Sequence, residues 1–161
     1  MTFVATDPAG GQGENTWFTP QSIIQALGPF DMDVCTVSWR PFNTAKLHIE
    51  HDKGHCSLRA DWYGFVWMNP PYGKEIEPFI KKFKEHRSGI ALVFARMGTS
   101  WMQDWIRNGG GVYLLRKRIR FINKDNMKSS GSAGADSCLL FLGDKARVRI
   151  EASGLEGVFI K

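Results

Sequence analysis

The tetrapeptide Asn69-Pro70-Pro71-Tyr72 places a side-chain amide, two rigid backbone positions and an aromatic ring side by side. It follows directly on the apolar residues 65–68, whose composition is typical of a buried strand. The two prolines fix the backbone and so hold the neighbouring groups in place. The four residues therefore suit chemistry that needs pre-placed hydrogen-bond acceptors next to a flat apolar surface.

The exocyclic amine of a nucleobase is a substrate with this need, because its lone pair is delocalised into the ring and makes it a poor nucleophile. The side-chain oxygen of Asn69 and the backbone carbonyl of Pro70 can accept both amine protons and turn the lone pair toward an electrophile. Tyr72 offers a ring against which a base that has left the duplex can stack. No general base with a tuned pKa is required before the amine attacks.

Strand and helix patterns alternate around this motif. Behind it, Ile76, Phe79, Ile80 and Phe83 recur at helical spacing, with Pro78 tolerated because it lies in the first turn. Further strands are predicted over residues 30–36, 46–50, 90–95, 111–115 and 138–142, and a further helix over 100–107. This alternation indicates an open α/β sheet, in which ligands bind at the carboxyl ends of the strands.

A short helix is predicted ahead of the first of these strands. Thr19 can cap it, Pro20 suits its first position and Gly28 suits its end. Two segments are expected to be flexible because they are rich in glycine and small polar residues. They are a leader over residues 1–16 and a loop over residues 129–137.

The composition indicates one compact domain with an anionic partner. The 161 residues are 43% hydrophobic, which suffices for one sizeable core. Lys and Arg number 21 against 16 Asp and Glu, so nucleic acid is the leading candidate partner. No apolar run approaches the roughly 18 residues that span a bilayer, and the N-terminus lacks a signal-peptide pattern. We therefore expect a soluble cytoplasmic protein without membrane contact.

The cysteines and histidines predict neither a disulfide framework nor a metal site. Cys35, Cys56 and Cys138 are odd in number and irregular in spacing, which favours buried thiols in a reducing compartment. Cys35 and Cys56 lie near three histidines, but the spacing of this group matches no common zinc site. The chemistry proposed for the tetrapeptide also needs no metal, so none is expected.

Several segments of the chain together resemble one family. Asn-Pro-Pro-Tyr after a strand is the signature of amino-methyltransferases that use S-adenosyl-L-methionine, and it would occur by chance in about one in a thousand chains of this length. The segments that fall in the family's order and spacing are residues 17–20, 30–36, 60–73, 91–96 and 99–101. Over about residues 17–142 the chain resembles the phage-type, Dam-like DNA N6-adenine methyltransferases.

The resemblance implies a single Rossmann-like methyltransferase domain, in a compact variant, over residues 17–161. It implies S-adenosyl-L-methionine as the cofactor and an adenine flipped out of double-stranded DNA as the methyl acceptor. Asn69, Pro70, Pro71 and Tyr72 are then the catalytic residues. No obligate protein partner is indicated, and the expected location is the cytoplasm of a bacterial host if a phage carries the gene.

The resemblance also assigns residues to the cofactor. Trp17, Thr19 and Pro20 border it, Asp33 orients it, and Asp61 accepts a hydrogen bond from its adenine amine. The loop after Asp33 lacks the glycines that such a site usually has. A rival is Asp-Pro-Ala-Gly-Gly-Gln-Gly at 7–13, which resembles the usual cofactor loop and follows a strand-like segment. The order of the segments favours the Asp33 assignment, and the rival stays open.

A basic run and one isolated arginine are the candidate DNA contacts. In the run 116–121, the predicted phosphate contacts are Arg116, Lys117, Arg118 and Arg120, and Phe121 is predicted to approach the flipped base. Arg96 follows the strand 90–95, where the family has a comparable arginine, although Gly98 replaces a common acidic residue. The alternative interpretation of the run is a solvated sheet edge.

Two other functions fit parts of the pattern. A protein-glutamine methyltransferase uses the same tetrapeptide on an amide nitrogen, but the positive charge and the phage-type segments argue against it. A non-catalytic nucleic-acid-binding module on the same fold is compatible with the missing glycine loop. The recognition sequence is not readable, because the candidate loops 41–60 and 122–137 carry no side-chain code for bases.

Overall fold

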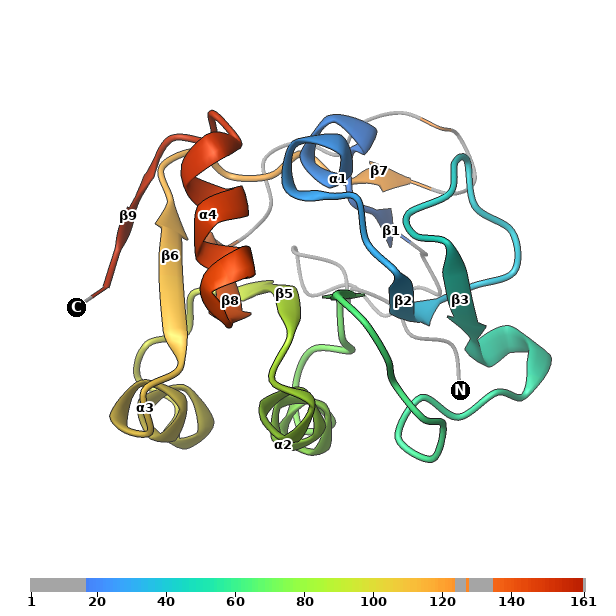
Figure 1. The fold of residues 1–161 in the computed structure, drawn as a ribbon, viewed down its shortest axis with the longest axis horizontal. Helices are drawn as coiled ribbons and strands as arrows, with labels where there is room; N and C mark the ends of the chain where they lie inside the picture. Colours follow the sequence, from blue (N-terminus) through green and yellow to red (C-terminus); the bar gives the residue numbers. More distant parts are fainter. Residues whose placement is uncertain (1–16, 124–126, 128–134, 161) are drawn as a thin grey trace.

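The computed structural model describes residues 17–123, 127 and 135–160. The predicted leader 1–16, the rival cofactor loop 7–13 and residues 129–134 of the predicted loop lie outside this part of the chain. Within it, a seven-stranded mixed sheet has the strand order β3-β2-β4-β5-β8-β6-β9 (Figure 1). Its strands are β2 (Met32–Thr36), β3 (Leu47–Glu50), β4 (Val66–Met68), β5 (Gly89–Phe94), β6 (Gly111–Leu115), β8 (Ser137–Leu142) and β9 (Gly157–Phe159).

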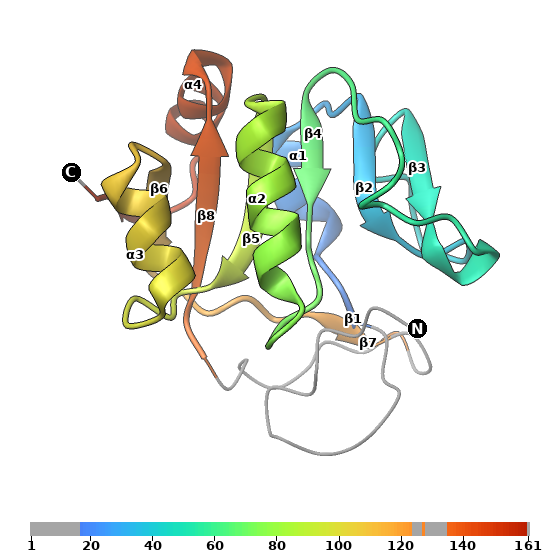
Figure 2. The ribbon, with the colours of Figure 1, turned by 90° about the horizontal axis from the view of Figure 1, so that it is seen from below.

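The strand directions place the carboxyl ends of β2, β3, β4, β5 and β6 at one edge of the sheet. β2, β3, β4 and β5 are parallel, whereas β8 is antiparallel to both β5 and β6. β6 therefore runs in the same direction as β5, and β9 runs against it. A separate antiparallel pair, β1 (Trp17–Phe18) with β7 (Ile122–Asn123), lies at the end of the sheet to which β4 points (Figure 2).

Helices cover both faces of the sheet. α2 (Ile76–His86) and α3 (Ser100–Arg107) pack on one face, while α1 (Gln21–Leu27) and α4 (Asp144–Ala152) pack on the other (Figures 1 and 2). The division follows from the alternation of side chains along each strand. In β4, Val66 and Met68 join the core under α2, whereas Trp67 joins the core under α1.

Aromatic contacts hold the two helical layers in place. Phe83 of α2 stacks on Trp105 of α3, with ring centroids 5.6 Å apart and planes 11° apart. On the other face, Phe30 stacks on Phe65 at 5.3 Å. Arg149 of α4 donates a hydrogen bond to the Gly28 carbonyl at the end of α1, which joins the two helices on this face.

Most elements agree with the sequence-based expectations. The helix over 100–107 and the strand over 111–115 have the predicted bounds, and the other predicted strands agree to within about two residues. The capping role predicted for Thr19 is wrong, because Pro20 is the cap residue of α1 and no side-chain cap bond forms. The Thr19 side chain is buried and faces Asn69 instead.

The crevice of the sheet lies between β2 and β4. The chain leaves β2 toward β3 on one side, but leaves β4 through α2 toward β5 on the other side. The connections therefore diverge at the carboxyl ends of these two strands, which is where open α/β sheets bind their ligands.

Three features bear on the expectations drawn from composition: the cysteines, the lengths of the helices and the grouping of possible metal ligands. All three cysteines are free thiols, but Cys56 is exposed rather than buried, while Cys138 is fully buried. None of the helices in the described part of the chain combines the length and the apolar composition that a membrane crossing requires. Among these same residues, no three His, Cys, Asp or Glu side chains converge in an arrangement that would hold a metal ion.

Candidate active site

A cleft opens between the carboxyl ends of β2 and β4 and is bordered by β1. It encloses about 590 Å³ of empty space, counted to its open mouth. Its lining residues are Trp17, Phe18, Thr19, Asp33, Cys35, Thr36, Val37, Arg40, Pro41, Phe42, Thr44, His51, Trp67, Asn69, Pro70 and Pro71. The crevice expected from the strand order is thus lined by three residues of the tetrapeptide.

Asn69 lies one residue beyond β4, and both ends of its side-chain amide have partners. Its Nδ2 group donates to Thr19 Oγ1 at 3.5 Å, and the Tyr72 hydroxyl donates to its Oδ1 at 2.9 Å. Because these partners come from two different segments of the chain, they hold the amide in one orientation in the wall of the cleft.

The Tyr72 hydroxyl has a second acceptor within reach. The Leu92 carbonyl oxygen lies 3.3 Å from it. The pairing between β4 and β5 ends at Met68 and Ala91, so Leu92 lies one residue beyond the last pair. A phenol has one proton to donate, either to the amide or to the carbonyl. The hydrogen bond to Asn69 can therefore be exchanged for one to Leu92.

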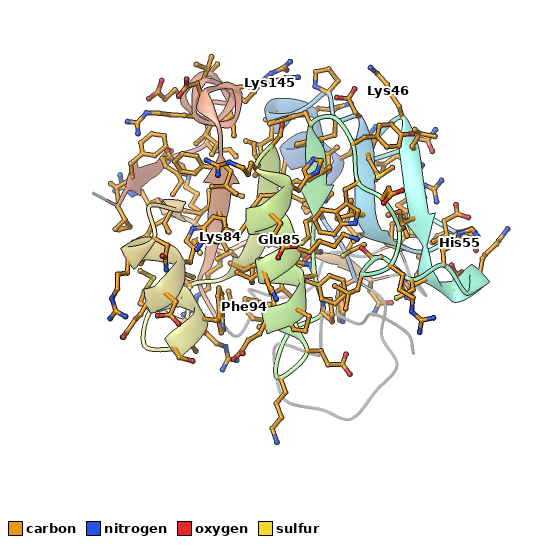
Figure 3. The ribbon with its side chains drawn as sticks, turned by 60° about the horizontal axis from the view of Figure 1, so that its bottom comes forward. Lys46, His55, Lys84, Glu85, Phe94 and Lys145 are labelled. Carbon is orange, nitrogen blue, oxygen red and sulfur yellow. The ribbon has the colours of Figure 1, made fainter. Side chains whose placement is uncertain are left out.

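The Tyr72 ring is packed as firmly as its hydroxyl. It stacks on Phe94 at the end of β5, with ring centroids 4.2 Å apart and planes 20° apart. Figure 3 shows Phe94 well away from Lys46 and Lys145, which lie toward the other end of the sheet. Burial raises the pKa of Tyr72 well above its ordinary value, so the hydroxyl keeps its proton. One ring face is covered by Phe94, and the Tyr72 ring is not part of the cleft lining.

Asp33 brings a carboxyl group into the other wall of the cleft. The residue is only 3% exposed, and its carboxyl accepts hydrogen bonds from Thr44 Oγ1 and from the Cys35 backbone N–H. Burial raises the pKa of Asp33 to about 6, although these two hydrogen bonds oppose the rise. The group is therefore mainly ionised at neutral pH and becomes protonated in mildly acidic solution.

The loop after β2 is held by carboxylates rather than shaped by glycines. Asp52 accepts two hydrogen bonds from Ser38, one from the backbone N–H at 2.8 Å and one from the hydroxyl at 2.6 Å. Arg40 donates to Glu50 Oε1 at 2.8 Å. The backbone N–H groups of Cys35 and Ser38 are thus already bonded to side chains of the protein, and they are not free to cradle a phosphate group.

The residues predicted to bind the cofactor fall into two groups. Trp17, Thr19 and Asp33 all line the cleft, although Trp17 and Thr19 lie in and just after β1 and Asp33 lies in β2. Pro20 follows Thr19 at the start of α1, and Asp61 is exposed in the segment before β4; neither is part of the lining. The structure brings the first group together with Asn69 and leaves the second outside.

The basic residues lie at the same edge of the sheet as the cleft. The run 116–121 starts directly after β6, and Arg96 lies two residues after β5. Both strands run in the same direction as β4, so their carboxyl ends lie at the same edge. All five side chains predicted to contact phosphate are exposed: Arg96, Arg116, Lys117, Arg118 and Arg120. Glu156 lies 3.3 Å from Lys117, and Asp136 lies 2.7 Å from Arg118. Such exposed pairs are weak and leave the cations available to phosphate.

Phe121 does not have the exposure that its predicted role requires. Its side chain is 1% exposed, and it belongs to the core between the sheet and the helices α1 and α4. Ile119 is buried in the same core. The alternation in the run turns the apolar side chains inward and the basic ones outward, so the prediction that Phe121 approaches the base is wrong.

Three side chains that hold the site in place were not identified from the sequence. Phe94 ends an apolar strand, and no local signal separates it from the other core residues. Thr44 and Arg40 lie in a loop without a periodic pattern, and their contacts with Asp33 and Glu50 depend on how the chain folds back.

The family of the chain follows from comparison with known proteins. A family model described as DNA N-6-adenine-methyltransferase (Dam) matches residues 11–153. The chain belongs to the Dam family. This assignment confirms the resemblance predicted from the sequence, and it makes the chain an adenine-specific DNA methyltransferase rather than an enzyme for protein glutamine. Neither a curated protein nor a solved structure matched the chain.

Proposed function

We propose that this Dam family enzyme transfers the methyl group of S-adenosyl-L-methionine to the N6 amine of an adenine that has flipped out of double-stranded DNA. The observation that carries the proposal is the Asn69 amide, held between Thr19 and Tyr72 in the wall of the cleft. A fixed amide oxygen at this place is what an amine with a delocalised lone pair needs.

The strand order supports a Rossmann-like methyltransferase domain over residues 17–161. Four parallel strands carry the crevice, and the antiparallel strand β8 separates β5 from β6. The compact variant expected from the sequence is supported by the short connection from β2 to β3, which contains no helix in this structure. The cleft lies at the point where the connections diverge, as in other open α/β sheets.

The chemistry of the cleft supports S-adenosylmethionine over a cofactor with phosphates. When bound, this cofactor supplies an electrophilic methyl group on a positively charged sulfur. Asp33 offers a carboxylate that attracts positive charge, and Trp17 and Thr19 line the opposite wall. Two backbone N–H groups that could cradle a phosphate are already bonded to Asp33 and Asp52. For Pro20 and Asp61, which lie outside the cleft lining, we propose only secondary contacts with the cofactor.

The hydrogen bond of Tyr72 suggests how Asn69 becomes available. The Tyr72 hydroxyl donates a hydrogen bond to Asn69 Oδ1. If the Tyr72 hydroxyl turns to the Leu92 carbonyl at 3.3 Å, the amide oxygen of Asn69 can accept a hydrogen bond from the adenine amine instead. The Pro70 carbonyl accepts the second amine proton, so the lone pair points toward the methyl group. Tyr72 stays neutral throughout and does not act as the base.

The basic edge of the sheet supports DNA binding beside the cleft. We propose phosphate contacts for the five exposed cations, which are Arg96, Arg116, Lys117, Arg118 and Arg120. Neutralising a phosphate releases counterions, so each contact adds affinity without reading the base sequence. The adenine must leave the duplex to reach Asn69, at a cost of a few kcal/mol.

The direct test is a methylation assay with isotope-labelled S-adenosylmethionine. A duplex with adenines should acquire label as N6-methyladenine, detected by mass spectrometry of the nucleosides, whereas a duplex of inosine and cytosine should not. Calorimetry with S-adenosylmethionine alone tests the cofactor separately. Cofactor binding without any methylation of DNA would leave a non-catalytic module as the better description.

A further inference from the structure

Two aromatic side chains in the described part of the chain are strongly exposed, and they lie at opposite edges of the sheet. Trp39 is 48% exposed and follows β2 at the carboxyl edge, next to the cleft. Tyr63 is 51% exposed and precedes β4 at the amino edge. A large aromatic ring in water forgoes the free energy of burial, so its exposure at a ligand edge calls for a physical reason.

The backbone on both sides of Trp39 is anchored. Ser38 donates two hydrogen bonds to Asp52, at 2.8 and 2.6 Å. Arg40 donates to Glu50 at 2.8 Å and to the Val37 carbonyl at 2.8 Å. The segment that carries the exposed ring is thus hydrogen-bonded to Glu50 at the end of β3 and to Asp52 just after it. A side chain that is held in place before binding loses less entropy when a ligand packs on it.

The position of Trp39 connects it to the cleft. Its ring lies 5.8 Å from the Phe18 ring, with the planes tilted by 55°. Phe18 lines the cleft, and so does Arg40, the next residue after Trp39. Trp39 itself is not part of the lining and therefore stands outside the cavity. A ligand that covers the mouth of the cleft would meet this ring before it met the cofactor site.

We propose that Trp39 is a DNA contact whose indole stacks on a nucleobase at the mouth of the cleft, beside the adenine taken up by Asn69. The inference rests on the proposed function, because it assumes that DNA covers this edge of the sheet. Flipping one adenine leaves neighbouring bases with an uncovered face, and an aromatic ring can cover it. The family of the chain makes DNA the ligand, and Phe121 is buried and unavailable for this task.

The test compares Trp39→Ala and Trp39→Phe with the control Tyr63→Ala. Trp39→Ala should raise the Kd and the KM for duplex DNA about tenfold, the range measured for stacked bases. Trp39→Phe should restore most of the affinity, because it keeps an aromatic face. The salt dependence of DNA binding and the affinity for S-adenosylmethionine should stay unchanged in both variants, since no charge and no cofactor contact is lost. Tyr63→Ala should behave as the wild type.

Two results would overturn the assignment. One is an unchanged DNA affinity in Trp39→Ala. The other is a weaker affinity for S-adenosylmethionine with DNA binding intact, which would place Trp39 in the cofactor site. If the wild type itself binds neither ligand, the proposed function fails instead.

A measurement on the unaltered protein keeps the test valid if a variant does not fold. Wild-type protein is irradiated with a duplex that carries 5-bromouracil next to the target adenine, and the crosslinked peptide is identified by mass spectrometry. The proposal expects attachment at Trp39. Crosslinks confined to other residues would contradict it.

Discussion

Two aspartates that lie only two residues apart, Asp31 just before β2 and Asp33 within it, have opposite surroundings. Asp31, just before the strand, accepts hydrogen bonds from the Phe65 backbone N–H at 2.8 Å and from Lys46 at 2.9 Å, which lower its pKa. Asp33 is buried, and burial raises its pKa to about 6. The first carboxylate is stabilised by its contacts, whereas the second is held in a place that disfavours its charge.

The same contrast extends to the two edges of the sheet. At the amino edge, Lys46 pairs with Asp31, and Lys145 lies over the Phe65 ring at 4.7 Å (Figure 3). These contacts join segments that are separate in the sequence but adjacent in the fold. At the carboxyl edge, Asp33 and Asn69 line a cleft. The charged groups of the amino edge thus make contacts within the fold, whereas the carboxyl edge presents polar groups to a cleft.

The largest expected effect concerns Asn69. Asn69→Ala should lower kcat at least about a thousandfold, because it removes the acceptor that localises the amine lone pair. Cofactor affinity, measured by calorimetry, should stay within a few-fold. Asp31→Asn, at the amino edge, is the matched control and should keep its activity. Wild-type turnover in Asn69→Ala would refute the mechanism.

Asp33 should matter for the cofactor rather than for the chemical step. Asp33→Ala is expected to weaken S-adenosylmethionine binding at least about tenfold, or 1.4 kcal/mol. A truncated protein without residues 1–13 should bind the cofactor nearly as well as the full chain. The reverse pattern in calorimetry would transfer the cofactor role to the glycine-rich segment 7–13.

Tyr72→Phe tests whether the Tyr72 hydroxyl orients the Asn69 amide. The variant keeps the ring on Phe94 but loses the hydroxyl that orients Asn69. We expect kcat to fall about fivefold with an unchanged KM for S-adenosylmethionine, because one hydrogen bond contributes about 1 kcal/mol. Steady-state kinetics at saturating DNA measures both values. A change confined to the cofactor KM would mean that the hydroxyl serves the cofactor cleft instead.

The basic run should contribute through charge alone. Neutralising Lys117 and Arg118 to Gln should weaken DNA binding about threefold and reduce the slope of log affinity against log salt by about one to two. The matched control neutralises Lys46 and Lys145 at the amino edge and should leave the slope unchanged. Fluorescence anisotropy across a salt series gives both slopes. Equal slopes in the first variant and the wild type would mean that the run is a solvated edge.

The smallest expected effect is a difference in the pH dependence of stability. Because the pKa of Asp33 is raised to about 6 from 3.8, the folded state binds this proton more tightly than the unfolded state does. Ionised Asp33 therefore costs stability at pH 7, and the cost disappears as the pH falls from about 6 to 4. Asp33→Asn should raise Tm by about 5 °C at pH 7 and by less near pH 4.

Asp31→Asn should show the opposite sign. The lowered pKa of Asp31 means that its charge stabilises the fold above pH 3.8 and that this contribution is lost as the pH falls further. The variant should thus have a lower Tm than the wild type at pH 7, and the two should converge in acid. Calorimetric scans from about pH 2 to 7 decide this, and curves of the same sign would remove the contrast between the two aspartates.

Local patterns were enough to predict most of the fold, but not all of it. The apolar spacing in α2 and α3 is clear because one face of each helix packs on the core. The apolar runs of β5 and β8 are strong because both faces of these strands are covered by a core. α4 was not predicted, since only Ala146 and Ile150 are buried in it and Val148 is exposed. β1, β7 and β9 have two or three residues each, too short for any period to show.

The sequence by itself determined the tetrapeptide, its place after a strand, the basic run and the family to which they point. These features depend on neighbouring residues, and neighbours in sequence are neighbours in any fold. Thr19 as a partner of Asn69, the Tyr72 contact with Phe94 and the burial of Phe121 were decided by the tertiary structure. Each joins segments that are far apart along the chain, and only the order of strands in the sheet brings such segments together.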